Sequence, residues 1–133
     1  MKQAIDVGLP PLKQPFSWAI KTGNMQSASM LFTTHAAVRP DGSICTGDAS
    51  EQTRITLHNV RAAVQAAGGT MDDVTQVLVY LTDMADMPAI DAVYREFFTP
   101  PYPNRSSAVV GLVVAGMRVE MVVTAVISEL DQQ

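Results

Sequence analysis

Two charged residues stand inside apolar stretches near the C-terminal end of the chain. Arg105 follows Tyr102-Pro103-Asn104 and begins a stretch, 105–114, that carries no other charge. Glu120 lies within the apolar run 117–123. A guanidinium is the natural partner of a carboxylate because its planar fork makes two parallel hydrogen bonds. A carboxylate in an apolar stretch is costly unless it has a partner or a function. Arg105 therefore predicts a binding site for a small carboxylate-bearing metabolite, and Glu120 is a second candidate.

Each of these two residues also has a plainer interpretation. Arg105 equally fits an exposed arginine at the start of a strand, paired with some acid. Glu120 equally fits a glutamate that faces solvent at the edge of a sheet. In a strand, however, Glu120 shares its face with Val122 and Val126, which weakens that second interpretation. The sequence leaves both alternatives open.

Other residue types that carry catalysis are sparse. The two histidines, His35 and His58, are far apart, and the single cysteine is Cys45, so the sequence predicts no metal centre. Ser106 and Ser107 have no base close to them and no Gly-x-Ser-x-Gly motif, which argues against a serine nucleophile.

Composition narrows the functional classes further. The 133 residues fit one domain, 1–133, and 47% of them are hydrophobic, which argues against disorder. The net charge of −4 argues against a nucleic-acid binder, which needs a clustered basic face. No stretch approaches the roughly 18 apolar residues that span a membrane. The N-terminus has no apolar core of a signal peptide, and we expect a cytoplasmic protein.

Two segments show the three- and four-residue spacing of apolar side chains that is typical of amphipathic helices. The first is predicted to begin at Ser50 and to end at Gly68-Gly69, which fits a left-handed C-terminal cap. The second is predicted to begin at Asp86, with Pro88 in its first turn, and to end before the proline run that starts at Pro100.

The remaining structured segments are rich in β-branched residues and predict five strands. They lie at 16–21, 29–34, 74–82, 105–114 and 117–128, after an irregular lead-in over 1–14. The order is thus β-β-α-β-α-β-β. A tight turn at Ala115-Gly116 joins the last two strands, so we expect them to be neighbours that bring Arg105 and Glu120 to one cleft.

Two helices can cover only one face of such a sheet. The last strand is nevertheless apolar on both faces, with Val122 and Val126 on the second. Charged residues make up only 17% of the chain, below the roughly 25% that is usual for soluble domains. An apolar face that no helix covers predicts self-association.

Four segments in sequence order resemble the Rid (YjgF) family of enamine/imine deaminases. The likeness covers roughly residues 15–128 and is carried by Pro15-Phe16-Ser17-Trp18-Ala19, by Gln52 through Gly68, by Val93-Tyr94-Arg95-Glu96-Phe97-Phe98, and by Asn104-Arg105-Ser106-Ser107 followed by Val119-Glu120-Met121. The resemblance implies an α+β fold like that of chorismate mutase, with a mixed sheet and two helices on one face. It also implies a homotrimer with sites between subunits, and hydrolysis of a 2-aminoacrylate-like enamine or imine to a 2-oxo acid and ammonia without a cofactor.

The same resemblance implies roles for individual residues. Arg105 would bind the substrate carboxylate, Glu120 would lie beside the water and the departing nitrogen, and Phe16 would wall the pocket. Thr34-His35-Ala36 stands where many relatives have Ser-Gly-Gln, so Thr34 and His35 should line the site, with His35 adding bulk. Ser107 stands where deaminases often have cysteine.

Two rival functions stay open at this point. One is a non-catalytic trimer on the same fold that binds a metabolite or another protein, because a fold does not fix a function. The other is deamination of a larger enamine such as 2-aminomuconate.

Overall fold

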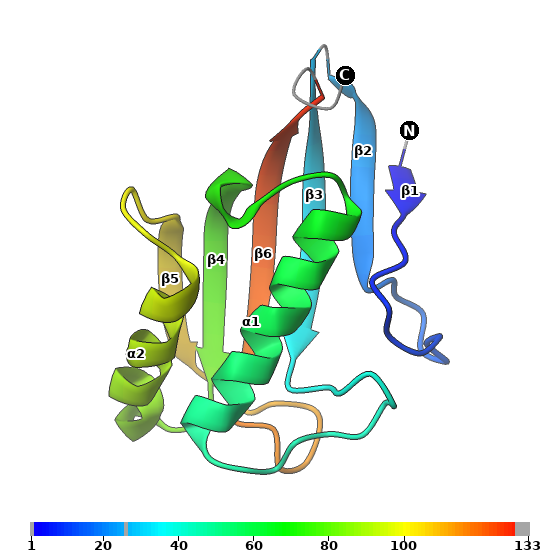
Figure 1. Ribbon diagram of the computed structural model, residues 1–133. Helices are drawn as coiled ribbons and strands as arrows, with labels where there is room; N and C mark the ends of the chain where they lie inside the picture. Colours follow the sequence, from blue (N-terminus) through cyan, green and yellow to red (C-terminus); the bar gives the residue numbers. More distant parts are fainter. Residues whose placement is uncertain (1, 26, 130–133) are drawn as a thin grey trace.

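A single six-stranded sheet with both helices on one face forms the framework of the molecule (Figure 1). The computed structural model describes residues 2–25 and 27–129. The strands are β1 (Lys2–Ala4), β2 (Ala19–Met25), β3 (Ala28–Ala36), β4 (Val74–Leu81), β5 (Asn104–Val109) and β6 (Val119–Ser128). The helices are α1 (Ala49–Ala66) and α2 (Met87–Phe97), and short 3-10 turns, η1 (Met71–Asp73) and η2 (Met84–Asp86), flank β4.

Among the described residues the strand order is β1-β2-β3-β6-β4-β5, with β4 and β5 parallel and the other neighbouring pairs antiparallel. This confirms the predicted mixed α+β sheet with two helices on one face. The N-terminal boundary of the sheet differs from the prediction. Residues 2–4, expected to be irregular, form β1 because their backbone pairs with residues 20–22 of β2. The strand expected at 16–21 begins only at Ala19, so residues 16–18 belong to the lead-in.

The predicted pairing of the last two strands is wrong. β5 ends at Val109, and residues 110–118 form a loop that leads to β6. The parallel pairing of β5 with β4 is the usual outcome of a strand–helix–strand crossover, here through α2. β6 then takes the place between β3 and β4. Arg105 and Glu120 therefore lie on strands that β4 separates.

The ends of α1 follow from local side-chain chemistry. The carboxylate of Asp48 accepts a hydrogen bond from the Glu51 amide, so the helix is capped two residues earlier than the predicted Ser50. At the other end Gly68 has φ +93°, and the Gly69 amide donates to the carbonyl of Val64. This confirms that the glycine pair ends the helix.

The core lies between the helices and the sheet. Fully buried side chains come from α1, α2 and the inward faces of β4 and β6, among them Leu57, Val60, Val64, Ile90, Val77, Val79, Met121 and Val123. Each large aliphatic side chain buried in this way contributes about 1.5–3 kcal/mol. The other face of the sheet has no helix over it, and Phe32 and Val126 are 44% and 37% exposed there. Among the described residues no helix is long and apolar enough to cross a membrane.

Candidate functional site

Arg105 lies at the start of β5 and points toward α2. Its guanidinium Nη1 is 2.7 Å from Oδ1 of Asp91, and the guanidinium carbon lies 4.9 Å from the ring centroid of Tyr94. Both partners belong to α2, so Arg105 occupies the helix-covered side of the sheet. A hollow of about 240 Å³ surrounds the group and is lined by Asp91, Tyr94, Arg95, Tyr102, Pro103 and Arg105.

This hollow, the arginine hollow, has the chemistry of an anion site. Within residues 2–25 and 27–129, the guanidinium of Arg105 makes one hydrogen bond, to Asp91, although it carries five N–H donors. Burial raises the pKa of Tyr94 to about 12, which keeps the phenol neutral and able to donate. The Tyr94 hydroxyl is buried and has no partner among the described residues. The remaining N–H groups of Arg105 therefore give this hollow donor capacity for a carboxylate.

Glu120 points to the opposite face of the sheet. Its neighbours in β6, Val119 and Met121, are fully buried toward the helices, and strand alternation directs the carboxylate away from them. Tyr80 and Ala36 lie beside Glu120 on the adjacent strands. Partial burial raises the pKa of the Glu120 carboxyl above its ordinary value. A raised pKa makes this carboxyl a better proton acceptor than an ordinary exposed glutamate.

Glu120 lines a second hollow of about 530 Å³, the glutamate hollow. Its lining comes from the lead-in, from the end of β3 and the loop after it, and from the loop 110–118. Most of this lining is apolar, and includes Pro10, Pro11, Leu12, Phe16, Trp18, Val38, Ile44, Val113, Val114 and Met117. Thr34, His35, Lys13 and Glu120 supply polar groups. Phe16, Thr34, His35 and Glu120, which were all predicted as site residues, thus line one hollow.

Aromatic contacts hold the lead-in against the sheet. The ring of Phe16 meets the indole of Trp18 edge to face, with centroids 5.9 Å apart. Trp18 in turn stacks on His35, with centroids 6.0 Å apart, and its indole N–H donates to the carbonyl of Pro10. Such aromatic pairs add about 0.5–1.5 kcal/mol each beyond their buried area. They fix the wall of the glutamate hollow.

His35 is neutral in the folded protein. Its ring is only 1% exposed, and burial lowers its pKa to about 4. The Thr33 hydroxyl donates to the carbonyl of Trp18, so in its 2.6 Å contact with His35 it accepts a hydrogen bond from the Nε2–H group of the ring. Nδ1 is then the unprotonated nitrogen, and it has no partner among the described residues. His35 lines the hollow as predicted, and its ring stacks on Trp18.

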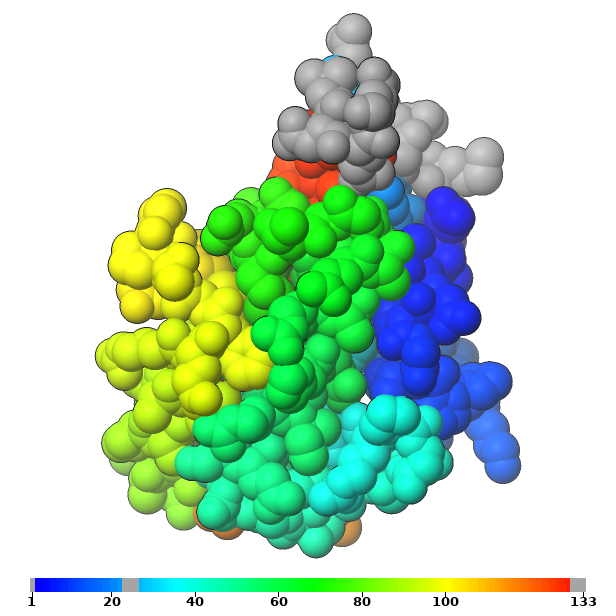
Figure 2. Space-filling model, in the orientation of Figure 1, coloured from blue at the N-terminus to red at the C-terminus, as the bar shows by residue number. Residues whose placement is uncertain are grey.

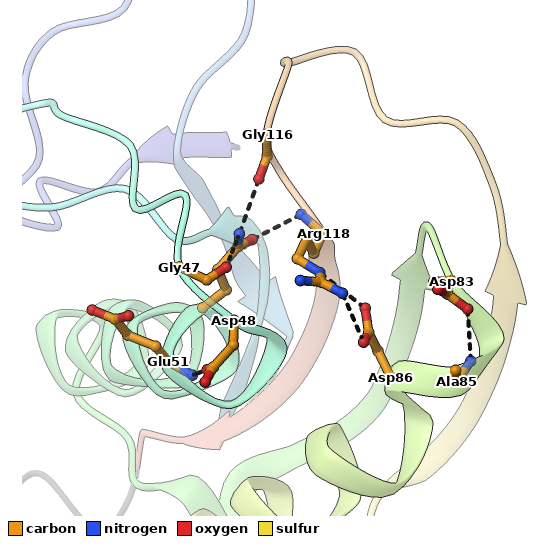
Figure 3. A network of polar contacts seen from close by, with 9 residues as sticks. Gly47, Asp48, Glu51, Asp83, Ala85, Asp86, Gly116 and Arg118 are labelled. Carbon is orange, nitrogen blue, oxygen red and sulfur yellow. Dashed lines mark hydrogen bonds and ion pairs between the residues drawn. The ribbon is translucent and has the colours of Figure 1, made fainter.

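A buried glutamine, which the sequence analysis did not single out, holds the loop 110–118 in place (Figure 3). Gln52 of α1 donates through Nε2 to the carbonyls of Gly47 and Gly116, at 3.1 and 2.9 Å. Its Oε1 accepts from the Arg118 amide at 2.8 Å. The Arg118 guanidinium makes two hydrogen bonds to the carboxylate of Asp86. Asp86 was predicted to cap α2, but its side chain makes no capping hydrogen bond. The sequence signal that could have identified Gln52 is its position, as a polar residue, on the buried face of α1.

The arginine and glutamate hollows are separate within one chain. In Figure 2 the segments around the first, yellow and yellow-green, and the lead-in beside the second, blue, lie on opposite sides of the view. Ser107 shares the face of Arg105, two residues along β5, and lines neither hollow. The expectation that Arg105 and Glu120 project into one cleft of a single chain is therefore wrong, because β4 separates their strands. No cluster of three metal-ligating side chains occurs in the part of the chain that the structure describes.

Comparison with known proteins identifies the family of this chain. The family model described as Endoribonuclease L-PSP, the YjgF/Rid family, matches residues 9–127. The chain belongs to this family. One relative is the 3-aminoacrylate deaminase RutC of Acinetobacter baylyi. It is 34% identical to this chain over 114 residues, and the match covers 86% of this chain and 88% of that protein.

Solved structures of family members share the fold. The TdcF protein of E. coli, solved with bound serine, superposes with a TM-score of 0.82 at 31% identity, covering 95% of this chain and 99% of that one. The YjgF protein of E. coli superposes with a TM-score of 0.81 at 28% identity, covering 93% and 98%. These relatives confirm the Rid resemblance and its fold.

Proposed function

We propose that this Rid protein hydrolyses small 2-imino acids and their enamine tautomers to 2-oxo acids and ammonia. The reaction adds one water across the C=N bond and releases the nitrogen, so it needs no redox partner. Three observations support the proposal: similarity to a relative named as a 3-aminoacrylate deaminase, the donor capacity around Arg105, and a carboxyl with a raised pKa at Glu120.

In this mechanism Arg105 binds the substrate carboxylate and thereby fixes the adjacent imine carbon. Its positive charge also offsets the negative charge beside that carbon and favours attack by water. Glu120 relays a proton from the attacking water to the nitrogen, which then leaves as ammonia. A protonated imine is already reactive, so positioning and proton transfer supply the catalysis.

The separation of Arg105 from Glu120 indicates that the proposed site is shared between two copies of the chain. The carboxylate and the imine carbon of a 2-imino acid are bonded to each other, yet the two residues face opposite sides of the sheet. Their strands are also two strand spacings, about 9–10 Å, apart. One small substrate cannot contact both in the same chain. The proposed site therefore combines Arg105 of one copy with Glu120 of another.

Exposed residues of the sheet and of the loop 110–118 fit such an assembly. All six residues of the edge strand β5 are exposed, and so are Phe32, Val113 and Val126. An uncovered apolar face of this kind marks a protein–protein contact. We propose a homotrimer in which Phe16, Thr34 and His35 of one copy wall the substrate and Ser107 of the next lies near its carboxylate.

Mixing two inactive variants tests the shared site. We expect Arg105→Lys and Glu120→Gln homotrimers to be impaired, and a denatured and refolded equimolar mixture to regain activity. About a quarter of the sites in a randomly mixed cyclic assembly combine an intact Arg105 with an intact Glu120. The assay follows loss of imines generated in situ by an amino-acid oxidase, against a control without the protein.

Three outcomes would contradict parts of the proposal. A mixture as inactive as its components would place both residues in one chain's site. Sedimentation equilibrium at micromolar concentration that gives a monomer would remove the shared site altogether. Wild-type protein that binds a 2-oxo acid but accelerates the hydrolysis of no imine would favour a metabolite-binding protein instead.

That binding alternative has its own support, because the relative TdcF was solved with serine bound. Testing imines with side chains of several sizes in the same assay distinguishes these alternatives. A metabolite-binding protein hydrolyses none of them, whereas a deaminase acts either on small imines or on a larger enamine such as 2-aminomuconate. The family description also names an endoribonuclease. The net charge of −4 argues against that activity here, because RNA binding relies on clustered cationic side chains.

A further inference from the structure

We propose that Asp91 is a built-in competitor for the ligand carboxylate at Arg105. The inference rests on the proposed role of Arg105 and adds a control on that same site. Asp91 presents the same chemical group as the ligand, on the same helix face that lines the arginine hollow. Binding of a carboxylate must then displace Asp91 from Arg105 or share the guanidinium with it.

The carboxylate of Asp91 already occupies part of the hydrogen-bonding capacity of the Arg105 guanidinium. Oδ1 of Asp91 lies 2.7 Å from Nη1, at the short end of charge-assisted hydrogen bonds. The ring of Tyr94, at 4.9 Å from the guanidinium carbon, packs against the arginine. Asp91 and Tyr94 of α2 thus hold Arg105 in the arginine hollow before any ligand binds.

The burial of this ion pair makes the competition significant. The side chains of Arg105 and Asp91 are 29% and 27% exposed. The ion pair between Arg54 of α1 and Glu96 of α2 is 46% and 52% exposed at a similar separation of 2.7 Å. Less solvent around a pair means less screening, so the Arg105–Asp91 attraction is the stronger of the two. A ligand carboxylate also meets repulsion from Asp91 at short range.

The consequence for specificity follows from where the rest of the ligand is bound. Asp91 lowers the affinity for every carboxylate equally, because it acts at the common group. Only ligands that gain further contacts in the apolar glutamate hollow of the neighbouring copy overcome that cost. Asp91 therefore protects Arg105 from simple anions and makes binding depend on the side chain of the substrate.

The test measures calorimetric binding of pyruvate, a stable 2-oxo acid, to the wild-type protein and to Asp91→Asn. Asparagine keeps the size of the side chain and removes its charge. We expect pyruvate to bind about two- to fivefold more tightly to the variant, the range for removing one partly screened charge interaction. Pyruvamide, which lacks the negative charge, should bind equally to both proteins.

Glu96→Gln is the matched control. It changes the net charge by the same amount on the same helix, but it acts on the pair with Arg54 and leaves the arginine hollow intact. We expect its pyruvate affinity to equal that of the wild type. Circular dichroism of each variant checks that α2 is retained.

The results separate this inference from the proposed function. Weaker or unchanged pyruvate binding in Asp91→Asn overturns the inference, because Asp91 would then orient Arg105 or play no part. Equal tightening in Glu96→Gln also overturns it, since the effect would be one of net charge. Tighter binding in Asp91→Asn without hydrolysis of any imine upholds the inference and removes the deaminase function. Imine hydrolysis that depends on Arg105, together with weaker pyruvate binding in Asp91→Asn, upholds the deaminase function and overturns the inference about Asp91.

Discussion

The arginine hollow and the glutamate hollow differ in size, charge and construction. The first measures about 240 Å³ and is lined by two guanidinium groups, a carboxylate and two tyrosines. The second measures about 530 Å³ and is mostly apolar, with Glu120 and Lys13 as its charged residues. The first is built on the regular elements α2 and β5 and the short segment between them, and the second largely on loops and the lead-in.

This difference assigns different parts of binding to the two regions. A fixed cation on regular structure orients one group of a ligand, because its position varies little. An apolar hollow between loops adapts to size and contributes in proportion to the area that it buries. The proposed division is therefore orientation at Arg105, and chemistry and side-chain selection at Glu120.

The largest expected effect comes from Glu120→Gln. Glutamine keeps the size and the hydrogen-bonding reach of the residue but cannot transfer the proton. We expect kcat for imine hydrolysis to fall about 10²–10⁴-fold, the usual contribution of a positioned proton-transfer group. Calorimetric binding of pyruvate should be retained, because Arg105 is untouched. Equal loss of binding and turnover would give Glu120 a binding role and erase the contrast between the two regions.

Acid should lower the stability of the folded protein through protonation of His35, which lines the glutamate hollow. The folded-state pKa of His35 is about 4, below its ordinary 6.5, so the unfolded chain binds the proton more readily. Its contribution to stability is fully present above pH 6.5 and is lost as the pH falls toward 4. The expected loss in the free energy of unfolding is about 3 kcal/mol. Urea titrations across this range measure it.

His35→Gln provides the comparison for that measurement. Glutamine retains hydrogen-bonding groups near Thr33 but does not titrate, so the variant should show a shallower fall in stability between pH 6.5 and 4. Identical pH profiles for the variant and the wild type would show that His35 is not the group responsible.

A smaller effect is expected from Arg105→Lys. Lysine keeps the positive charge but loses the planar fork, which costs on the order of 1–3 kcal/mol for a charged hydrogen bond. This corresponds to roughly ten- to hundred-fold in both pyruvate affinity and kcat/KM. The two losses should be parallel, unlike those in Glu120→Gln. A variant that binds normally but turns over slowly would assign chemistry to the arginine hollow.

Local sequence patterns determined the two helices and the C-terminal end of α1. The glycines after residue 67 end α1, and the Asp73 carboxylate accepts a hydrogen bond from the Thr70 amide at the start of η1. Pro88 lies in the first turn of α2, as expected. These features depend on hydrogen bonds and backbone preferences within a few residues, so they can be derived without the tertiary structure. The sequence also singled out Arg105 and Glu120, because charges in apolar stretches need a reason.

Only the tertiary structure decided how these residues are related. Strand pairing depends on which segments the crossover through α2 brings together, and two strands adjacent in sequence, β5 and β6, are separated by β4. The partner of Arg105 lies 14 residues away on a helix, and Gln52 bonds to a loop 64 residues away. Pairings over such distances are selected by the packing of the whole chain, since no local preference specifies which acid or which carbonyl a side chain will meet.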